Sequence, residues 1–251
     1  MHGLDFLSYS WFLAIGALLF AAFIRGATGF GLDLVFTPFM ILIIDPKAAI
    51  PVILLLAQLS NIVVLASCFR KVNIKRLLPM FAGSLLGVPV GVFIIIIISA
   101  AILKIFIGGM TILFSILLVF KLTPRFTNER LAAGIAGFLC GMLTTSAGLG
   151  GPPVILFMHN QKWPKEEIYP SLSAFFLIST GASLIGLSLS GLVTHHILLT
   201  SASLVPGLVI GMFLGMLAFK HVNESYFRIL SVMVIIGAGV LAVLSGLGNM
   251  K

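Results

Sequence analysis

Long apolar runs follow one another along almost the whole chain. Runs without any charged residue cover positions 48–69, 77–99, 105–120, 168–192, 197–219 and 229–247. A helix needs about 20 predominantly apolar residues to cross the hydrocarbon core of a bilayer. A strand of a membrane barrel alternates polar and apolar positions instead, whereas residues 92–103, VFIIIIISAAIL, form one continuous run. The pattern therefore predicts an all-α fold of membrane-spanning helices.

The composition agrees with this pattern. Hydrophobic residues make up 60% of the 251 residues and charged residues only 9%, and the mean hydropathy is +1.22. A typical soluble domain carries about 25% charged residues, so this chain cannot cover a folded surface with polar groups. We therefore expect an integral membrane protein in a lipid bilayer. The net charge of +8 is typical of basic cytoplasmic loops and does not indicate nucleic-acid binding.

The two halves of the chain resemble each other at four places in the same order. ATGFGLD at 27–33 corresponds to TSAGLGGP at 145–152, and DPKAAIP at 45–51 corresponds to WPKEEIYP at 163–170. GSLLGVPVG at 83–91 matches GLVIGMFLG at 207–215, and LKIFIGG at 103–109 parallels FRILSVM at 227–233. These matches predict a duplication, with a first transmembrane repeat at 1–122, a cytoplasmic linker at 123–130 and a second repeat at 131–251.

The distribution of basic residues predicts how the two repeats are oriented. We expect about five membrane segments in each half, the first two short and broken, so that the second half enters the membrane upside down. One side then collects eleven of the 15 Lys and Arg residues and the other three, while Arg25 lies within the membrane. Four segments per half would give eight against six. Since cytoplasmic loops carry the excess of Lys and Arg, we expect inverted-topology repeats with both termini outside the cytoplasm.

The stretch RGATGFGLD at 25–33 interrupts the apolar pattern with two charges and three glycines. Each glycine disfavours a helix by about 1 kcal/mol relative to alanine. Non-helical backbone survives at membrane depth only where it is buried in protein or lines a watery cavity. The second half repeats the interruption in TTSAGLGGPP at 144–153, where Pro152 and Pro153 favour the start of a new helix. Paired interruptions of this kind point to a binding site near the membrane midplane.

The chemistry of both interruptions suits an anion. The first N–H groups of a helix, together with the positive end of its dipole, attract negative charge. Threonine and serine add hydroxyl donors, and the planar guanidinium of Arg25 matches an oxyanion. The candidate substrate-binding residues in the two stretches are Arg25, Thr28, Gly29, Gly31, Thr144, Thr145, Ser146 and Gly148.

Several of these residues have alternative roles. Arg25 either contacts the substrate, pairs with Asp33 to hold the break together, or snorkels to an interface. Asp33 is the only acidic residue within the membrane segments, and it is either a proton carrier or the ionic partner of Arg25. Gln58 and Asn61 share a helix face. They either line the cavity as further binding residues or bond a neighbouring helix.

Glycines spaced by four mark one face of two further segments. Small residues at this spacing let membrane helices approach closely. The two faces serve either packing within the chain or a homodimer interface; they consist of Gly83, Gly87 and Gly91 and of Gly207, Gly211 and Gly215. Apart from His195 and His196 in an outer loop, no ligand types stand at metal spacing, so we expect neither a metal nor a cofactor.

The chain resembles the TauE/SafE sulfite-exporter family, also called the TSUP family. The resemblance covers residues 12–247. It rests on GATGFGLDLVFTP at 26–38, GMLTTSAGLGGPPVILF at 141–157, the proline–lysine loop after each, and the basic loop RKVNIKRLLP at 70–79. It implies a permease of the bacterial inner membrane for sulfite, sulfoacetate or other organosulfonates, generally an exporter. The family's first half often reads Gly-x-Gly-Gly-Gly, where this chain has Leu32 and Asp33.

Two functions compete on these grounds. The first is an alternating-access transporter that holds the anion at half-helix N-termini near the midplane. The second is an anion channel that uses the same breaks as a filter. The chain contains no HExxH, no GxSxG and no acidic pair in its membrane segments, so we do not expect an enzyme.

Overall fold

The computed structural model describes residues 8–28, 31–68, 72–120, 128–161, 163–218 and 224–248. Within these ranges the chain forms ten α-helices and no β-strand, as the apolar pattern predicted. The first half contains α1 (Tyr9–Thr28), α2 (Leu32–Ile43), α3 (Pro46–Cys68), α4 (Ile74–Ile97) and α5 (Ala100–Phe120). The second half contains α6 (Glu129–Ala147), α7 (Gly151–Asn160), α8 (Lys165–Leu189), α9 (His195–Ala218) and α10 (Glu224–Gly248).

Seven of the described helices are long and apolar enough to cross a membrane, namely α1, α3, α4, α5, α6, α8 and α9. This confirms a multi-pass helical membrane protein. Our expectation that the first two helices of each half are both short was wrong. α1 and α6 contain 20 and 19 residues, and only α2 and α7, with 12 and 10 residues, are short. α1 stays helical past Gly26 to Thr28, and α6 stays helical up to Ala147, directly before Gly148, so only the second helix of each pair is short.

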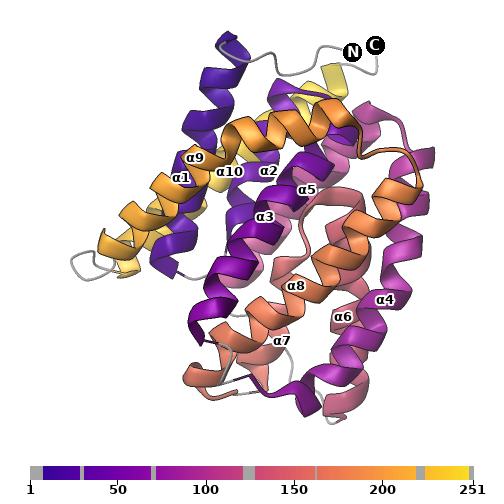
Figure 1. The fold of residues 1–251 in the computed structure, drawn as a ribbon, viewed down its shortest axis with the longest axis vertical. Helices are drawn as coiled ribbons and strands as arrows, with labels where there is room; N and C mark the ends of the chain where they lie inside the picture. Colours follow the sequence, from indigo (N-terminus) through magenta and orange to yellow (C-terminus); the bar gives the residue numbers. More distant parts are fainter. Residues whose placement is uncertain are drawn as a thin grey trace.

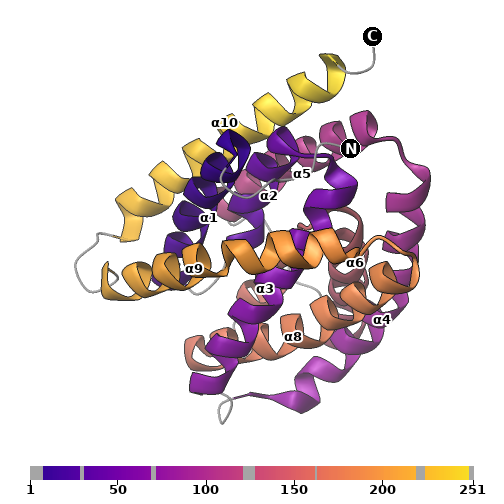
Figure 2. The ribbon, with the colours of Figure 1, turned by 45° about the horizontal axis from the view of Figure 1, so that its top comes forward.

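Helices from the two halves of the chain pack in pairs. α4 lies along α6, α1 along α9, α5 along α10, and α3 against α8. In both Figure 1 and Figure 2, α3 runs through the middle of the bundle. One buried apolar cluster includes residues of α2 such as Val35 and Phe36, and the other includes residues of α7 such as Val154 and Met158. The two short helices are therefore anchored in different parts of the core.

Both glycine faces are buried inside the chain. A Cβ added at Gly83, Gly87 or Gly91 of α4 would overlap a backbone carbonyl oxygen of α6. On α9, a Cβ at Gly211 or Gly215 would meet a backbone oxygen of α1 in the same way. Small residues allow this approach because membrane helices associate mainly through close packing. The homodimer interface that we considered for these faces is therefore wrong: their surface is already covered by α6 and α1.

Candidate functional site

Two short helices of the bundle begin just after the glycine-rich breaks. Gly31, directly before α2, has a φ of +93°, and Gly148, directly after α6, has a φ of +65°. A residue with a Cβ rarely adopts this left-handed backbone. Gly148 donates its N–H to the last turn of α6, and α7 begins shortly afterwards at Gly151, with Pro152 in its first turn. Both interruptions predicted from the sequence are therefore present.

The starts of α2 and α7 meet at a cavity of about 20 Å³. One water molecule needs about 10–15 Å³, so the cavity as it stands has room for about one water molecule. Its walls come from α1, α2, α3, α7 and α8. The lining residues are Arg25, Gly31, Leu32, Asp33, Leu34, Ala57, Ser60, Asn61, Gly151, Pro152, Ile155 and Phe176.

Backbone donors are concentrated at this cavity. The first N–H groups of a helix have no acceptor within the helix. In α2, the N–H of Val35 donates to the carbonyl of Gly31 and so begins the bonding pattern of the helix. The residues between these two, at the start of α2, line the cavity, as does Gly151 at the start of α7. The positive ends of two helix dipoles therefore converge on one small space.

Arg25 is held in a fixed orientation at the cavity. Its side chain is only 5% exposed. Its Nε donates to Oγ of Ser60 at 3.1 Å, and its Nη2 donates to Oδ1 of Asn61 at 2.7 Å. Among the described residues, no acceptor is bonded to the third nitrogen, Nη1. The helix α3 thus orients the guanidinium and leaves one of its nitrogens available to a ligand.

Asp33 lines the same cavity from the first turn of α2. Its Oδ1 is buried and has no hydrogen-bond partner in the described part of the chain. The only ion pair among the described residues joins Arg76 to Glu129. The direct pair of Arg25 and Asp33, one of our alternatives, is therefore not formed, although both side chains border one cavity.

The arrangement is a small, largely buried site with one fixed cation, two helix N-termini and one unpaired carboxyl group. The family model of the sulfite exporter TauE/SafE matches residues 14–242 of the chain. The chain belongs to the TauE/SafE family. This family consists of membrane transporters and not of enzymes. No curated protein and no solved structure gives a significant match to the chain.

Two other residues of this TauE/SafE protein, Asn61 and Gln58, were predicted to bind substrate, and only one of them lies at the cavity. Asn61 lines the cavity and holds Arg25, as one of our alternatives required. Gln58 is not among the lining residues; its Nε2 donates to the carbonyl of Leu177 on α8 at 3.1 Å. Gln58 thus bonds a neighbouring helix. The side chain of Thr28 and the whole of Gly29 lie outside the described residues.

The three hydroxyl residues of α6 are buried but do not line the cavity. Oγ1 of Thr145 lies 2.8 Å from both the carbonyl oxygen of Gly141 and Oγ of Ser183, between which its single O–H is shared, and Ser146 donates to the carbonyl of Met142 at 2.7 Å. Thr144 lies 3.7 Å from the sulfur of Cys140. Hydroxyls within helices commonly bond back to their own backbone in this way. They are therefore occupied in α6 and do not point free donors at the cavity.

Gly148 does not line the cavity but contacts the short helix α2. Its carbonyl accepts a hydrogen bond of 3.1 Å from Oγ1 of Thr37 on α2. The break after α6 is therefore tied to the short helix of the other half. This contact helps to hold the starts of α2 and α7 near the same cavity.

Sequence reasoning missed several residues of the site. Ser60 lies between Gln58 and Asn61 in the segment AQLSN and is not among the predicted binding residues. A hydroxyl next to an amide in an apolar segment is a signal that could have indicated a partner for Arg25. Ile155 and Phe176 form apolar walls, and no pattern in the sequence separates them from ordinary core residues. Gly151 follows directly from the second break.

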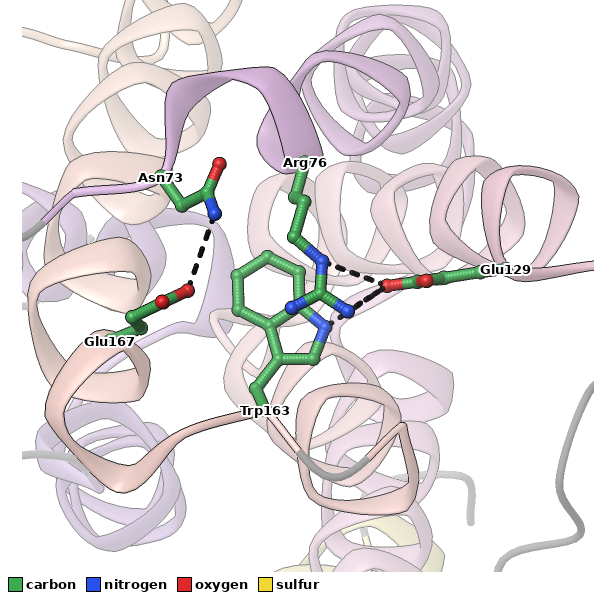
Figure 3. Close-up of polar contacts among 5 residues, drawn as sticks. All are labelled: Asn73, Arg76, Glu129, Trp163 and Glu167. Atoms are coloured by element: carbon green, nitrogen blue, oxygen red, sulfur yellow. Dashed lines mark hydrogen bonds and ion pairs between the residues drawn. The ribbon is translucent and has the colours of Figure 1, made fainter.

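A second polar cluster lies where α4, α6 and α8 begin (Figure 3). Oε1 of Glu129 accepts three hydrogen bonds, two from Arg76 and one from Nε1 of Trp163 at 3.2 Å. The guanidinium of Arg76 also lies over the ring of Trp163, 4.4 Å from its centroid. Nearby, Nδ2 of Asn73 donates to Glu167 at 3.3 Å. These contacts join the ends of three helices at a distance from the cavity lining.

Proposed function

We propose that this chain is a transporter that moves sulfur-containing anions, such as sulfite, sulfoacetate or other organosulfonates, across the inner membrane by alternating access. The anion binds between Arg25 and the starts of α2 and α7, where the cavity widens to admit it during the transport cycle. The TauE/SafE family implies a sulfite-type anion. A sulfur oxyanion presents several acceptor oxygens, which suit the backbone N–H groups and the guanidinium of this cavity.

One observation carries the proposal: the N-termini of two short helices from the two halves meet beside a buried arginine that has a nitrogen without an acceptor in the described part of the chain. Each element by itself is common. Together they put positive potential on one site from three directions, and among the lining residues only Asp33 balances it. An anion is the ligand that this charge distribution favours.

The helix pairing supports the inverted repeat that such transporters use. If the halves 1–122 and 131–251 correspond helix by helix, α1 matches α6 and α4 matches α9. The contact of α4 with α6 then becomes that of α9 with α1, while the contacts of α3 with α8 and of α5 with α10 map onto themselves. We propose that residues 123–130 form a cytoplasmic linker and that both termini are extracytoplasmic. α1 begins and α10 ends at the same end of the molecule in Figure 1.

A carrier fits this cavity better than a channel does. A channel filter needs a row of sites along a continuous pore, whereas the cavity here is a single space of about 20 Å³. Export of an anion from a cell that is negative inside is electrically downhill by about 2.3 kcal/mol per charge for each 100 mV. An anion that leaves the cell without a coupled ion therefore gains a driving force from the membrane potential.

The test is anion binding to the purified full-length protein, followed by flux measurements in proteoliposomes. The panel contains sulfite, sulfate, thiosulfate, sulfoacetate and taurine, with acetate as the carboxylate control. Wild type is compared with Arg25→Ala and with Arg130→Ala, which removes an exposed arginine at the start of α6. Hydrogen bonds to a charged group contribute about 1.5–3 kcal/mol, so Arg25→Ala should weaken binding about 10- to 150-fold.

The expected result is saturable, sulfur-selective binding and flux that Arg25→Ala weakens by this factor and Arg130→Ala leaves intact. Flux that rises linearly with concentration would favour the channel. Equal losses in both arginine variants would show that net charge, and not the cavity, determines transport. Wild-type protein that binds no member of the panel would refute the proposed function.

A further inference from the structure

Asp33 borders the cavity and has one carboxyl oxygen without a hydrogen-bond donor. Its Oδ1 is buried and unbonded in the described part of the chain, and the guanidinium of Arg25 is engaged by Ser60 and Asn61 instead. An ionised carboxylate can only accept hydrogen bonds. Burying it without donors is unfavourable. A protonated carboxyl group would instead supply a donor.

The groups that face Asp33 leave Arg25 as its only charged neighbour among the residues that line the cavity. α3, α7 and α8 line the cavity with uncharged side chains only. On α6, the nearby titratable group is the buried thiol of Cys140. α5 and α10 also pack on α2. Lys104 of α5 directs its Nζ to Ser245 of α10 at 3.5 Å and is not in the cavity wall.

Asp33 and an incoming anion compete for the same positive groups. With Asp33 ionised, its charge offsets that of Arg25, and the anion meets a like charge inside a small buried space. The oxygens of both partners are acceptors, so neither can bond the other. With Asp33 protonated, the charge of Arg25 is uncompensated and the carboxyl O–H can donate to an oxygen of the anion.

We propose that Asp33 takes up a proton when the anion binds, so that the cavity carries one anion and one proton together. The inference rests on the proposed function, because it assigns a coupling role to the same site. The proton comes from the water phase to which the cavity opens and resides on the carboxyl group of Asp33. The bound pair carries one negative charge fewer than the anion alone, so the membrane potential acts on it less strongly.

The experiment measures anion affinity and proton uptake against pH in the purified full-length protein. Thiosulfate and ethanesulfonate are the probes because both are anions of strong acids, whose charge stays constant from about pH 5 to pH 8, so that any change of affinity with pH arises in the protein. Calorimetry in two buffers of different ionisation enthalpy counts the protons taken up with each anion. The variants are Asp33→Asn and, as a matched control, Glu167→Gln, which removes a carboxylate that bonds Asn73 at the start of α8.

For wild type we expect affinity to fall about tenfold per pH unit in the upper part of the range, with uptake approaching one proton per anion. Asp33→Asn should bind with an affinity that does not change with pH and without proton uptake, because the amide is permanently neutral. Glu167→Gln should behave like wild type.

Two results would overturn the inference, and they are distinguishable. Wild-type binding of constant affinity without proton uptake would remove the coupling and leave the anion site standing. Failure of wild type to bind either probe at every pH would overturn the coupling and the proposed anion site together. If Asp33→Asn does not fold, the proton count on wild type still decides whether a proton accompanies the anion, and a count of zero overturns the inference.

Discussion

Asn61→Asp is the sharpest test of how the cavity is charged. The substitution keeps the size and shape of the side chain but replaces the amide that accepts from Nη2 of Arg25 at 2.7 Å with a carboxylate. The new carboxylate would pair with Arg25, so the protein should fold. The guanidinium would then be neutralised by a neighbour that cannot leave, and the anion would lose its principal cation.

The magnitude follows from the geometry at Arg25. The guanidinium lies between the side chain at position 61 and an anion bonded to its free side, which separates the two negative charges by about the width of that group. At a separation of about 6 Å and an effective dielectric constant of about 20, two like charges repel by about 3 kcal/mol. This corresponds to a loss of affinity of about a hundredfold.

The assay is anion binding by calorimetry at constant pH, with a thermal melt to show that the variant is folded. Asn128→Asp is the matched control, because Asn128 caps α6 by accepting from the N–H of Leu131 and aspartate caps a helix equally well. The control should bind as wild type does. If Asn61→Asp were folded and bound the anion with unchanged affinity, the anion would not depend on Arg25 and the site would lie elsewhere.

Three further predictions concern the scaffold. Gly87→Ala should lower the free energy of unfolding by about 1–3 kcal/mol, because its Cβ would overlap the backbone of α6. Gly109→Ala, where a Cβ meets nothing within 4 Å, should leave the free energy of unfolding unchanged in the same thermal melt. A double-mutant cycle on Arg76 and Glu129, measured by thermal unfolding, should give a coupling of about 1 kcal/mol, and zero coupling would show that the cluster does not join its helices. Thr145→Val should cost about 1 kcal/mol of stability with unchanged anion affinity; a large loss of binding would return this hydroxyl to the substrate site.

The helical membrane fold could be predicted well because it depends on local chemistry. Hydrocarbon cannot bond free backbone groups, so each long apolar run must be a helix wherever it lies in the chain. The breaks before Leu32 and Gly151 were equally visible, since glycine and proline act on the backbone directly. The lengths of α1 and α6 were misjudged, because the sequence shows where a glycine-rich stretch lies but not the residue at which the helix ends.

The site could be predicted only in part. Arg25, Gly31 and Asn61 were found because charge, glycine and amide are rare in apolar segments and indicate a special environment. Thr145 and Ser146 have the same rarity and yet bond the carbonyls of their own helix. A hydroxyl can bond its own backbone or a ligand, and its direction depends on the rotation of the helix against its neighbours.

The sequence alone therefore determined that this chain is a membrane protein, that it is helical, where two helices are interrupted, and which family it resembles. Only the tertiary structure decided that Ser60 and Asn61 orient Arg25, that Asp33 stays apart from it, and that the glycine faces are covered within the chain. The physical reason is the separation along the sequence over which each interaction acts. Burial in lipid and backbone preference act on each segment separately, whereas a cavity exists only where helices distant in the sequence pack side by side.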